Sequence, residues 1–483
     1  MKNILIKLIY CLTLLTVING CSSLVDDSNE DPDLLISANA KDYFQGILLA
    51  NQFFQNSDGS RTSMIWLNQA NGEDRQYAVL NNWNSSAASE FNDDWNLAYA
   101  NCITQAKIAE ELCDKESNKM LKGAIQVIDA NCIGTITALW GDAPYSDIDI
   151  TGKNLTPKFD SQISLYNKVQ LLLDDAIANL NSPGVIPASD FYYNGDAGSW
   201  IKLAYSLKAR YYLHTKDYVN AKKNALLGIS DASGDFKAKF GSTGSIQDFN
   251  PFYTFLIYER DSYMSGDSYA SRLLNPSDAL YRGNEKTDES ARFAYTYTDL
   301  SEDGYFSTSL NVRGADYGGT NGKFGNDTAA PLVTYGEMLL IIAEVDARDS
   351  FDSGLTSYNN YRALLNTGYS IGINNDGYDS ETFKYEAYDS SDFASGGIEN
   401  LSPSITEQDA LLREILQERY TYFIGHFESF NDFGRTNNKA EIQLKTGYTG
   451  TPQRFLYPQD EVNANPNTPS PIPTVITKTP VHN

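Results

Sequence analysis

Residues 120–145 read MLKGAIQVIDANCIGTITALWGDAPY, and this segment carries the clearest structural signal in the chain. Its apolar side chains recur every three to four residues, which is the spacing of one helix face, at Leu121, Ile125, Ile128, Cys132, Ile136 and Leu139. Gly141 and Pro144 follow, and both residue types end helices. The segment therefore predicts a long helix over 120–140 that a turn closes.

The same periodicity predicts three more helices downstream. Residues 161–180 carry an apolar face, and Asp160 is placed to cap that helix. Residues 200–214 and 218–227 follow each other closely, as the two arms of a helical hairpin do. Small residues such as Ala221 in the second arm resemble a tetratricopeptide-type repeat, in which they let paired helices pack closely.

Beyond this hairpin the pattern changes. Between residues 230 and 330, Gly, Ser, Asp and aromatic residues dominate and helical periodicity fades. Helices are predicted again over 332–348 and 407–430, and Thr406 with Asp409 has the spacing of a capping box. Residues 466–483 are rich in proline, which predicts an extended or disordered tail because proline lacks the backbone donor that a helix needs.

The N-terminus has the pattern of a lipoprotein signal. Two lysines precede an uncharged apolar run from Leu8 to Ile18, which is too short to span about 30 Å of hydrocarbon as a helix. Gly20-Cys21 then resembles the lipobox of bacterial lipoproteins, where the signal is cut before a cysteine that carries acyl chains such as palmitate. We expect residues 1–20 to be a signal peptide and Cys21 to be lipidated. The alternative is an ordinary secretory signal with a chance cysteine.

An acidic segment follows Cys21 directly. Residues 21–35 predict a solvated tether that carries Asp26, Asp27, Glu30, Asp31 and Asp33. This arrangement resembles the surface-export signal of lipoproteins from Bacteroidetes-type bacteria. It implies an outer-membrane protein that is lipid-anchored at the cell surface.

The overall charge limits the classes of partner. The formal net charge is −25 at pH 7, which argues against nucleic acid, an anionic membrane surface and polyanionic ligands. The composition, 41% hydrophobic and 20% charged, is that of a globular protein. No later apolar run approaches 18 residues, so we expect membrane contact through the lipid alone.

Three cysteines remain in the chain that follows Cys21. Cys102 and Cys113 are three helical turns apart, about 16 Å, and cannot bridge within one straight helix. Two interpretations stay open. Cys113 and Cys132 form a disulfide between neighbouring helices, or all three are buried free thiols.

Several short motifs lie at the ends of the predicted helices. The most specific are Gly-Asp-x-Pro-Tyr at 141–145 and Gly-Asp-x-x-x-Trp at 195–200. Together with later segments these motifs resemble the SusD/RagB family of outer-membrane nutrient-binding lipoproteins, over about residues 36–465. One departure is Ala204-Tyr205-Ser206, where the family usually has Ala-Asn-Ser. The matching motif residues are Gly141, Asp142, Pro144, Tyr145, Asp196, Trp200, Arg210, Glu344, Arg419 and Arg435.

The resemblance implies a fold and a function. The fold is mostly α-helical, with tetratricopeptide-like helix pairs that form an α-α superhelix and long irregular loop insertions. Residues 36–465 then form a single nutrient-binding domain. The protein binds an oligosaccharide or another nutrient and delivers it to a SusC-like TonB-dependent barrel, without catalysis.

Most of the matching residues are expected to be structural. Asp142, Asp196 and Arg210 lie at helix ends or on packed helices, where they cap, turn or form ion pairs. Glu344 has Arg348 four residues on, the ordinary helical salt-bridge spacing, so its pairing with Glu337 on one face is a scaffold feature rather than a catalytic pair. The tryptophans at helical spacing, Trp95, Trp140 and Trp200, are expected in the core.

Aromatic side chains are the stronger signal for a ligand. The chain has 32 Tyr, 22 Phe and 5 Trp, and sugar rings pack their flat C–H faces on aromatic rings. Those in predicted loops are the candidates for ligand binding: Trp66, Tyr77, Trp83, Tyr258, Tyr263, Tyr269, Tyr281, Tyr295, Tyr305 and Tyr317.

Two other functions stay open from the sequence. One is a surface glycoside hydrolase of helical fold, and the other is a helical scaffold lipoprotein that binds no nutrient. The ligand could also be a peptide rather than a glycan. The sequence predicts no Gly-x-Ser-x-Gly elbow between a strand and a helix, and its three histidines do not have the spacing of metal ligands. We therefore predict neither a catalytic residue nor a metal or other cofactor. Asp- and Gly-rich loops leave room for structural calcium, but none has EF-hand spacing.

Overall fold

Helices dominate the part of the chain that the computed structural model describes, which is residues 38–242, 246–299, 308–313, 322–372, 382–401 and 405–482. The predicted signal peptide, Cys21 and the acidic tether lie outside these residues, as do Tyr305 and Tyr317. The predicted mostly α-helical class is confirmed.

The helix predicted over 120–140 is α7 (Lys119–Trp140), and it is buried along most of its length. It begins where the Asn118 side chain accepts a hydrogen bond from the Leu121 amide. It ends at Gly141, whose φ of +85° lies in the region that favours glycine. The last carbonyls of the helix are not left unpaired, because Phe455 N–H donates to Leu139 O at 2.8 Å and Arg454 donates to Trp140 O.

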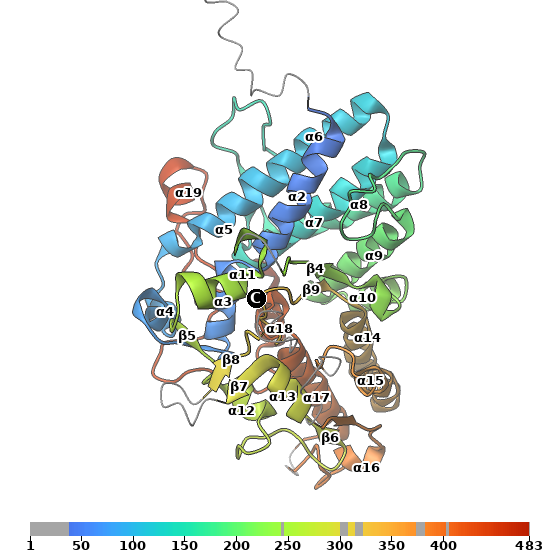
Figure 1. Ribbon diagram of the computed structural model, residues 1–483, viewed down its shortest axis with the longest axis vertical. Helices are drawn as coiled ribbons and strands as arrows, with labels where there is room; N and C mark the ends of the chain where they lie inside the picture. The colour runs from blue at the N-terminus through green and yellow to red at the C-terminus, as the bar shows by residue number, and fades with distance from the viewer. Residues whose placement is uncertain are drawn as a thin grey trace, which may run out of the picture.

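The helices pack as antiparallel neighbours in a curved row that runs down one side of the molecule (Figure 1). Helix α7 packs on α8 (Gln162–Leu180), and α9 (Ala197–His214) packs on α10 (Tyr218–Ala225). The row continues with α14 (Tyr335–Asp349) on α15 (Phe351–Leu365). This row is the predicted set of tetratricopeptide-like pairs.

Close approach within these pairs depends on small residues. A Cβ atom at Gly123 of α7 would lie 2.7 Å from Ala176 O of α8, so the two backbones meet there. Helix α2 (Ala40–Gln55), the π-helix η3 (Leu97–Ile103) and helix α6 (Thr104–Glu116), which continues η3, also pack on α7. Together these helices enclose most of the larger hydrophobic core.

The second half of the chain adds α17 (Glu407–Tyr422) and α18 (Phe427–Thr436). The prediction of one helix over 407–430 is therefore wrong. The chain turns between the two helices, and Gly425 has a φ of +78°. A smaller core cluster lies between α14, α15 and α17.

The predicted helix starts and caps hold in part. Thr406 accepts a hydrogen bond from the Asp409 amide at 3.1 Å, as the spacing predicts. Asp160 is not a cap, because Ser161 accepts from the Ser164 amide at 3.3 Å and Asp160 accepts from the Ser146 amide instead. The helix predicted from residue 332 begins later, because the first residues belong to a strand.

Short antiparallel strand pairs fix the irregular insertions to the helices. Within the described ranges there are five pairs: β1 (Asn71–Gly72) with β5 (Met264–Ser265), β2 (Ala143–Pro144) with β3 (Phe159–Asp160), β4 (Phe236–Ala238) with β9 (Ala330–Val333), β6 (Thr287–Asp288) with β10 (Lys384–Tyr385), and β7 (Tyr297–Asp299) with β8 (Thr308–Leu310).

The same insertions also contain short helices. These are α3 (Asp58–Trp66), α4 (Arg75–Leu80), α5 (Asn92–Asn96), α11 (Pro251–Thr254), α12 (Tyr269–Leu274), α13 (Ser290–Thr296), α16 (Ser390–Phe393) and α19 (Gln459–Ala464). Single turns occur at η1 (Trp83–Ser85), η2 (Ala88–Phe91), η4 (Ala232–Gly234), η5 (Ile246–Asp248), η6 (Phe255–Glu259) and η8 (Pro480–His482).

The motif residues take structural positions. Asp196 caps α9 by accepting from the Ser199 amide at 2.7 Å, and Asp142 accepts from the Gln162 amide at 2.8 Å. Tyr145 donates to Asp129 at 2.7 Å, next to Pro144 in β2. Trp200 is buried and its indole donates to Asp190 at 2.8 Å.

Buried ion pairs join helices α9, α14, α17 and α18 to one another. Arg210 pairs with Glu337 at 2.6 Å, and Arg435 pairs with Glu344 at 2.5 Å. Arg419 pairs with Asp432 at 2.6 Å. Each of these side chains is almost fully enclosed, so the carboxylates of α14 serve the scaffold, as predicted.

Two further predictions concern the cysteines and the tail. Cys102, Cys113 and Cys132 are buried free thiols, so the disulfide alternative is wrong. The proline-rich tail is extended but packed against the molecule, so the disordered alternative is wrong. Val475 is buried, and the Val481 amide donates to Gln162 Oε1 at 2.9 Å.

Candidate functional site

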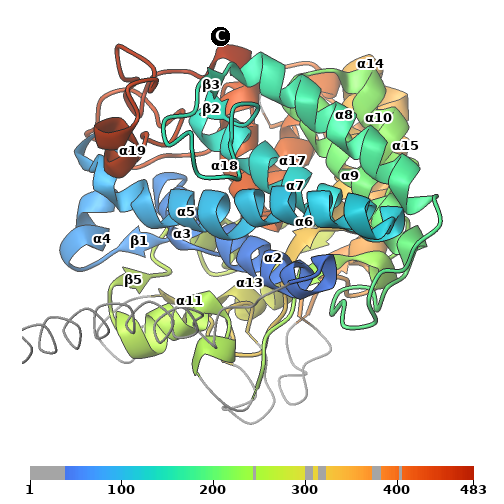
Figure 2. The same ribbon diagram turned by 90° about the horizontal axis from the view of Figure 1, so that it is seen from above.

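A cleft of about 560 Å³ opens where α3, α5 and α11 meet, and both ribbon views place these three helices close together (Figures 1 and 2). We call it the α3–α5–α11 cleft. It is lined by Phe53, Ser57, Asp58, Arg61, Asp93, Asp94, Leu97, Gln247, Phe249, Pro251, Thr254 and Glu259.

Aromatic rings form the apolar part of this cleft. Phe53 comes from the last turns of α2, and Phe249 directly precedes the turn that opens α11. Tyr258 lies beside the cleft, is 53% exposed and stacks on Phe249 with ring centroids 6.4 Å apart and planes 26° apart. The cleft therefore offers flat apolar faces next to polar side chains, which suits the two-sided surface of a sugar ring.

Arg61 forms the floor of the cleft and is held from several sides. Its guanidinium lies 4.3 Å from the centre of the Phe255 ring, and its Nε donates to the Tyr77 hydroxyl at 3.0 Å. Asp58 pairs with Nη2. Arg61 is only 6% exposed, yet within the described part of the chain its Nη1 has no hydrogen-bond partner.

Asp94 of α5 lies against the first turn of α3 and also has an unpaired side-chain atom. It is 2% exposed, and its Oδ2 has no hydrogen-bond partner among the described residues. Burial raises the pKa of this carboxyl to about 6, although the Ser57 hydroxyl and the positive charge of Arg61 favour its charged form. Both residues line the cleft, so its wall holds one unpaired donor and one unpaired acceptor, and each is costly to leave unpaired.

A second cleft of about 560 Å³ lies beside α12, but several of its polar groups are already paired. Arg272 bonds Asp278 at 2.9 Å, and the buried hydroxyls of Ser268 and Ser271 bond each other. Tyr269, which lines it, packs its ring towards Tyr420. Because these hydrogen-bonding groups satisfy each other, it is a weaker candidate.

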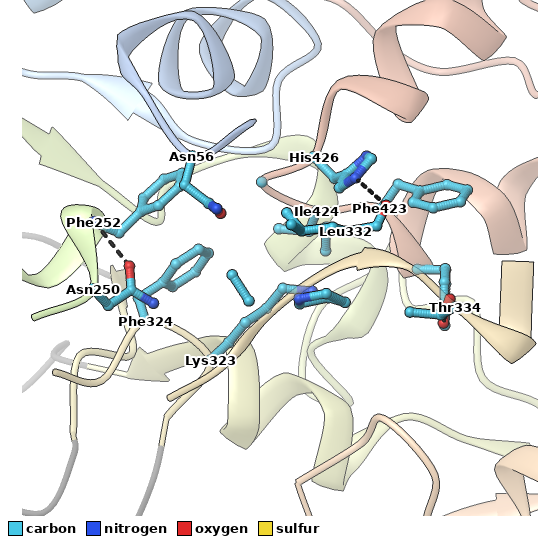
Figure 3. A pocket seen from close by; sticks show the side chains of 14 residues that line it. Asn56, Asn250, Phe252, Lys323, Phe324, Leu332, Thr334, Phe423, Ile424 and His426 are labelled. Carbon is cyan, nitrogen blue, oxygen red and sulfur yellow. Dashed lines mark hydrogen bonds between the residues drawn. The ribbon is translucent and has the colours of Figure 1, made fainter. Parts of the chain in front are cut away.

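A third hollow, of only about 30 Å³, lies between the loops around residues 250, 324 and 424 (Figure 3). Phe252, Phe324 and Ile424 line it, with Lys323 and His426 as its basic groups. Burial lowers the pKa of Lys323 to about 7 and that of His426 to about 3. The space suits one or two water molecules and is too small for a sugar ring.

The structure corrects the placement of several predicted ligand-binding aromatics. Trp66 is not in a loop: it ends α3, is completely buried and packs on Phe455. Trp83 is buried in a single turn, where its indole donates to Thr449 O at 3.1 Å. Both rings contact the protein interior, so they offer no face to a ligand.

Of the other predicted ligand-binding tyrosines that the structure describes, some pack beneath the cleft and the rest lie elsewhere. Tyr77 is buried beneath it and contacts Asp58 and Arg61, while Tyr263 packs edge-on against Tyr77. Tyr281 is half-buried, and its hydroxyl bonds Asp288 and accepts from the Glu289 amide. Tyr295 is half-buried next to Gly372. Tyr269 lies in the second cleft, and Tyr317 lies outside the described residues.

Of the predicted aromatics that fall in the described residues, Tyr258 alone is exposed beside the α3–α5–α11 cleft. Sequence reasoning missed Phe53, Phe249, Asp94 and Arg61. Phe249 sits at the edge of the aromatic region between 230 and 330, which was the one sequence signal for it. The others carry no local signal, because the fold brings them together from separate segments.

No arrangement that favours a metal is present in the described ranges. No group of three or more His, Cys, Asp or Glu side chains there is placed to hold an ion. None of the described helices is both long and apolar enough to cross a membrane.

Comparisons with known proteins agree with the fold. A SusD-like family model, described as starch-binding and associating with the outer membrane, matches residues 28–458. No curated protein matches the chain. A SusD/RagB family protein from Bacteroides thetaiotaomicron is 22% identical, with 89% of this chain and 95% of that chain covered and a TM-score of 0.61.

Two further solved structures have the same architecture. A SusD homologue from Bacteroides uniformis is 16% identical, covers 92% of this chain and 99% of its own, and has a TM-score of 0.64. A chitin-binding SusD homologue from Flavobacterium johnsoniae is 13% identical, covers 92% and 98%, and has a TM-score of 0.63. Since the family model spans most of its length, the chain belongs to the SusD-like family of proteins that associate with the outer membrane.

Proposed function

We propose that this protein is a cell-surface lipoprotein that binds an oligosaccharide in the α3–α5–α11 cleft and delivers it to a SusC-like TonB-dependent barrel. The observation that carries the proposal is the combination in one cleft of aromatic faces with unpaired polar atoms on Asp94 and Arg61. A sugar ring stacks its C–H face on an aromatic ring while a hydroxyl accepts from one polar group and donates to another.

Family membership supports the ligand class. The matching family is described as starch-binding, and one solved homologue binds chitin. Both ligands are polysaccharides, so short oligomers of glucose and of N-acetylglucosamine are the first compounds to test. The low identity to the solved homologues leaves the choice between them to experiment.

The test is affinity measurement on cleft variants. Phe249→Ala and Tyr258→Ala each remove a ring that supports the apolar face, worth on the order of 1–3 kcal/mol, or about 5- to 150-fold in Kd. Arg272→Ala, in the second cleft, is the matched control and should bind as the unchanged protein does. Calorimetry with maltooligosaccharides and chitooligosaccharides measures this. Equal affinity in all three variants would place the ligand elsewhere.

The hydrolase alternative is tested in the same assay. Asp94 has a raised pKa, as the general acid of a glycosidase does. Its carboxyl lies close to α3, where a Cβ atom at Gly59 would be 2.8 Å from Oδ2. Chromatography after prolonged incubation should show intact oligosaccharide, and released products would favour the hydrolase.

The remaining alternatives have distinct outcomes. A peptide ligand would be displaced from the cleft by peptides and not by oligosaccharides. A scaffold lipoprotein would bind neither, and its cleft variants would behave like the unchanged protein. The proposed partner is tested by purifying the tagged protein from outer membranes. We expect a TonB-dependent barrel to be purified with it.

The anchor is proposed from the sequence alone. Cys21→Ala should move the protein from the membrane fraction to the soluble fraction, because no described helix can replace the lipid. Replacing Asp26, Asp27 and Glu30 by Ala should keep the lipid but abolish removal by protease added to intact cells. A Cys21→Ala protein that withstands carbonate washing contradicts the anchor.

A further inference from the structure

We propose that the α3–α5–α11 cleft prefers saccharides that carry free ammonium groups, such as oligomers of glucosamine, over neutral and anionic saccharides. The inference rests on the proposed function, because it names the charge class of ligand for the same cleft. It is carried by the distribution of charged side chains around Phe249 and by two buried polar atoms that lack partners.

Carboxylates dominate the lining of the cleft. Asp58, Asp93, Asp94 and Glu259 all line it, and Arg61 is the one cation among the described lining residues. Asp93 and Glu259 are exposed on separate elements: Asp93 is on α5, and Glu259 is at the end of the turn that follows α11. The cleft as a whole therefore has an excess of negative charge.

The single cation does not offset this excess for a ligand. Arg61 pairs with Asp58 and stacks on the Phe255 ring, so its charge is neutralised within the floor of the cleft. Asp93 and Glu259 have no ion-pair partner within the described residues. An ammonium group on a bound sugar would therefore find two carboxylates that form no ion pair within the described residues.

The unpaired atoms give an independent indication that a ligand completes this site. Asp94 and Arg61 are both more than nine-tenths buried and line the cleft, and each leaves one side-chain atom without a partner in the described chain. Such buried groups are normally satisfied by protein, water or ligand. A sugar bearing both hydroxyl and ammonium groups supplies the acceptor that Arg61 lacks and the donors that the carboxylates lack.

A carboxylate or sulfate on the sugar has the opposite effect. It would lie among Asp93, Asp94 and Glu259 in a partly desolvated cleft, where like charges repel more strongly than in water. Neutral N-acetylated sugars fall between, because they keep the stacking and lose the ion pairs. The order expected is ammonium, then neutral, then anionic.

The experiment compares three trisaccharide probes by calorimetry on the full chain: triglucosamine, its N-acetylated form and a trigalacturonate. At about pH 6.5 and low salt we expect triglucosamine to bind at least about tenfold more tightly than the acetylated probe. At about 0.5 M salt the ratio should shrink, because exposed charges are screened. The trigalacturonate should bind most weakly.

Charge variants separate selectivity from binding itself. Asp93→Asn with Glu259→Gln should bring the ratio between the first two probes close to one and leave the melting temperature unchanged. Glu111→Gln with Asp352→Asn makes the same change in charge at exposed sites on α6 and α15 and should keep the ratio. A ratio near one in the unchanged protein, or a preference for the trigalacturonate, overturns the charge inference.

Phe249→Ala distinguishes a failure of the charge preference from a failure of the proposed binding site. If it weakens both the charged and the acetylated probe while their ratio is one, the proposed function stands and the charge inference fails. If it changes neither affinity, the cleft is not the binding site and both fail together.

Discussion

Asp94 shows how one residue links the site to the stability of the fold. Burial raises its pKa from 3.8 to about 6, so the folded state disfavours the charged carboxylate. A raised pKa of an acid means that the folded state binds a proton more readily than the unfolded state does. The resulting loss of stability is absent below about pH 4 and complete above about pH 6.

Asp94→Asn should therefore stabilise the protein at neutral and alkaline pH. Asn keeps an acceptor for the Ser57 hydroxyl but carries no charge to bury. A pKa difference of about two units corresponds to at most about 3 kcal/mol above pH 7, and the gain should vanish near pH 4. Urea denaturation of both proteins at the two pH values measures it. A variant that is less stable at pH 8 than at pH 4, relative to the unchanged protein, would contradict this assignment.

At the same scale, the sequence was a better guide to scaffold residues than to site residues. Asp196 and Glu344 were assigned to capping and ion pairing from local spacing, and both roles are observed. Trp66 was assigned to a ligand because its neighbourhood resembled a loop, and it lies in the core. Local spacing determines a cap, whereas the exposure of an aromatic ring depends on which distant segment covers it.

At the scale of elements, the paired helices depend on close backbone contact. Gly123 of α7 would place a Cβ atom 2.7 Å from Ala176 O and 2.8 Å from the Leu180 amide nitrogen, and backbone atoms cannot move aside cheaply. Gly123→Ala should therefore separate α7 from α8 and cost about 1–3 kcal/mol.

Gly46→Ala in α2 is the matched control for this prediction. Gly46 is exposed in mid-helix and has nothing within 4 Å of its Cβ position. The same substitution there should stabilise the protein by about 0.5–1 kcal/mol, since alanine favours helix more than glycine does. Melting temperatures should move in opposite directions. A shift of the same sign in both variants would show that helix propensity, rather than close packing, decides the outcome.

At this scale, a helix could be located from the sequence when its apolar residues form a regular stripe along one face. Helix α7 was located within one residue because its stripe is regular and its end carries Gly141. Helix α15 was missed because FDSGLTSYNNYRALL has few apolar residues and several helix-weak ones. The boundary between α17 and α18 was missed because both helices continue one periodic pattern across the turn.

At the scale of the whole molecule, the C-terminal tail closes the fold. The Gln453 amide donates to Val475 O at 2.8 Å, and His482 is buried against Gly434. Val475→Ser should lower the free energy of unfolding by about 2 kcal/mol, because it replaces a buried apolar side chain with a polar one. Ile472→Ser, at a residue that is half exposed in the same tail, should stay within about 0.5 kcal/mol. Similar losses from both substitutions would mean that the tail is not selectively anchored.

At the same scale, buried carboxyl groups make the stability of the fold depend on pH in two opposite ways. Burial raises the pKa of Glu418, but Arg292 and Arg282 outweigh it and hold that pKa at about 2. Glu344 behaves in the same way with Arg435 and Arg348. A depressed pKa stabilises the fold above the unfolded value, about 4.5, and this contribution is lost as pH falls towards 2.

Other carboxyls act in the opposite direction. Burial raises the pKa of Glu110 and of Glu399 to about 8, so each costs stability as pH rises from about 4.5 to 8. These two carboxyls therefore lower the melting temperature as pH rises from about 4.5 to 8, whereas the arginine-paired carboxylates lower it as pH falls below about 4.5. Glu110→Gln keeps an acceptor for the Gln126 amide, at 3.3 Å, and removes one ionisation. It should reduce the loss of stability between about pH 4.5 and 8 and leave the profile below about pH 4.5 unchanged, because Glu110 is protonated there in both the folded and the unfolded state. A variant profile parallel to that of the unchanged protein would show that Glu110 is already ionised in the fold.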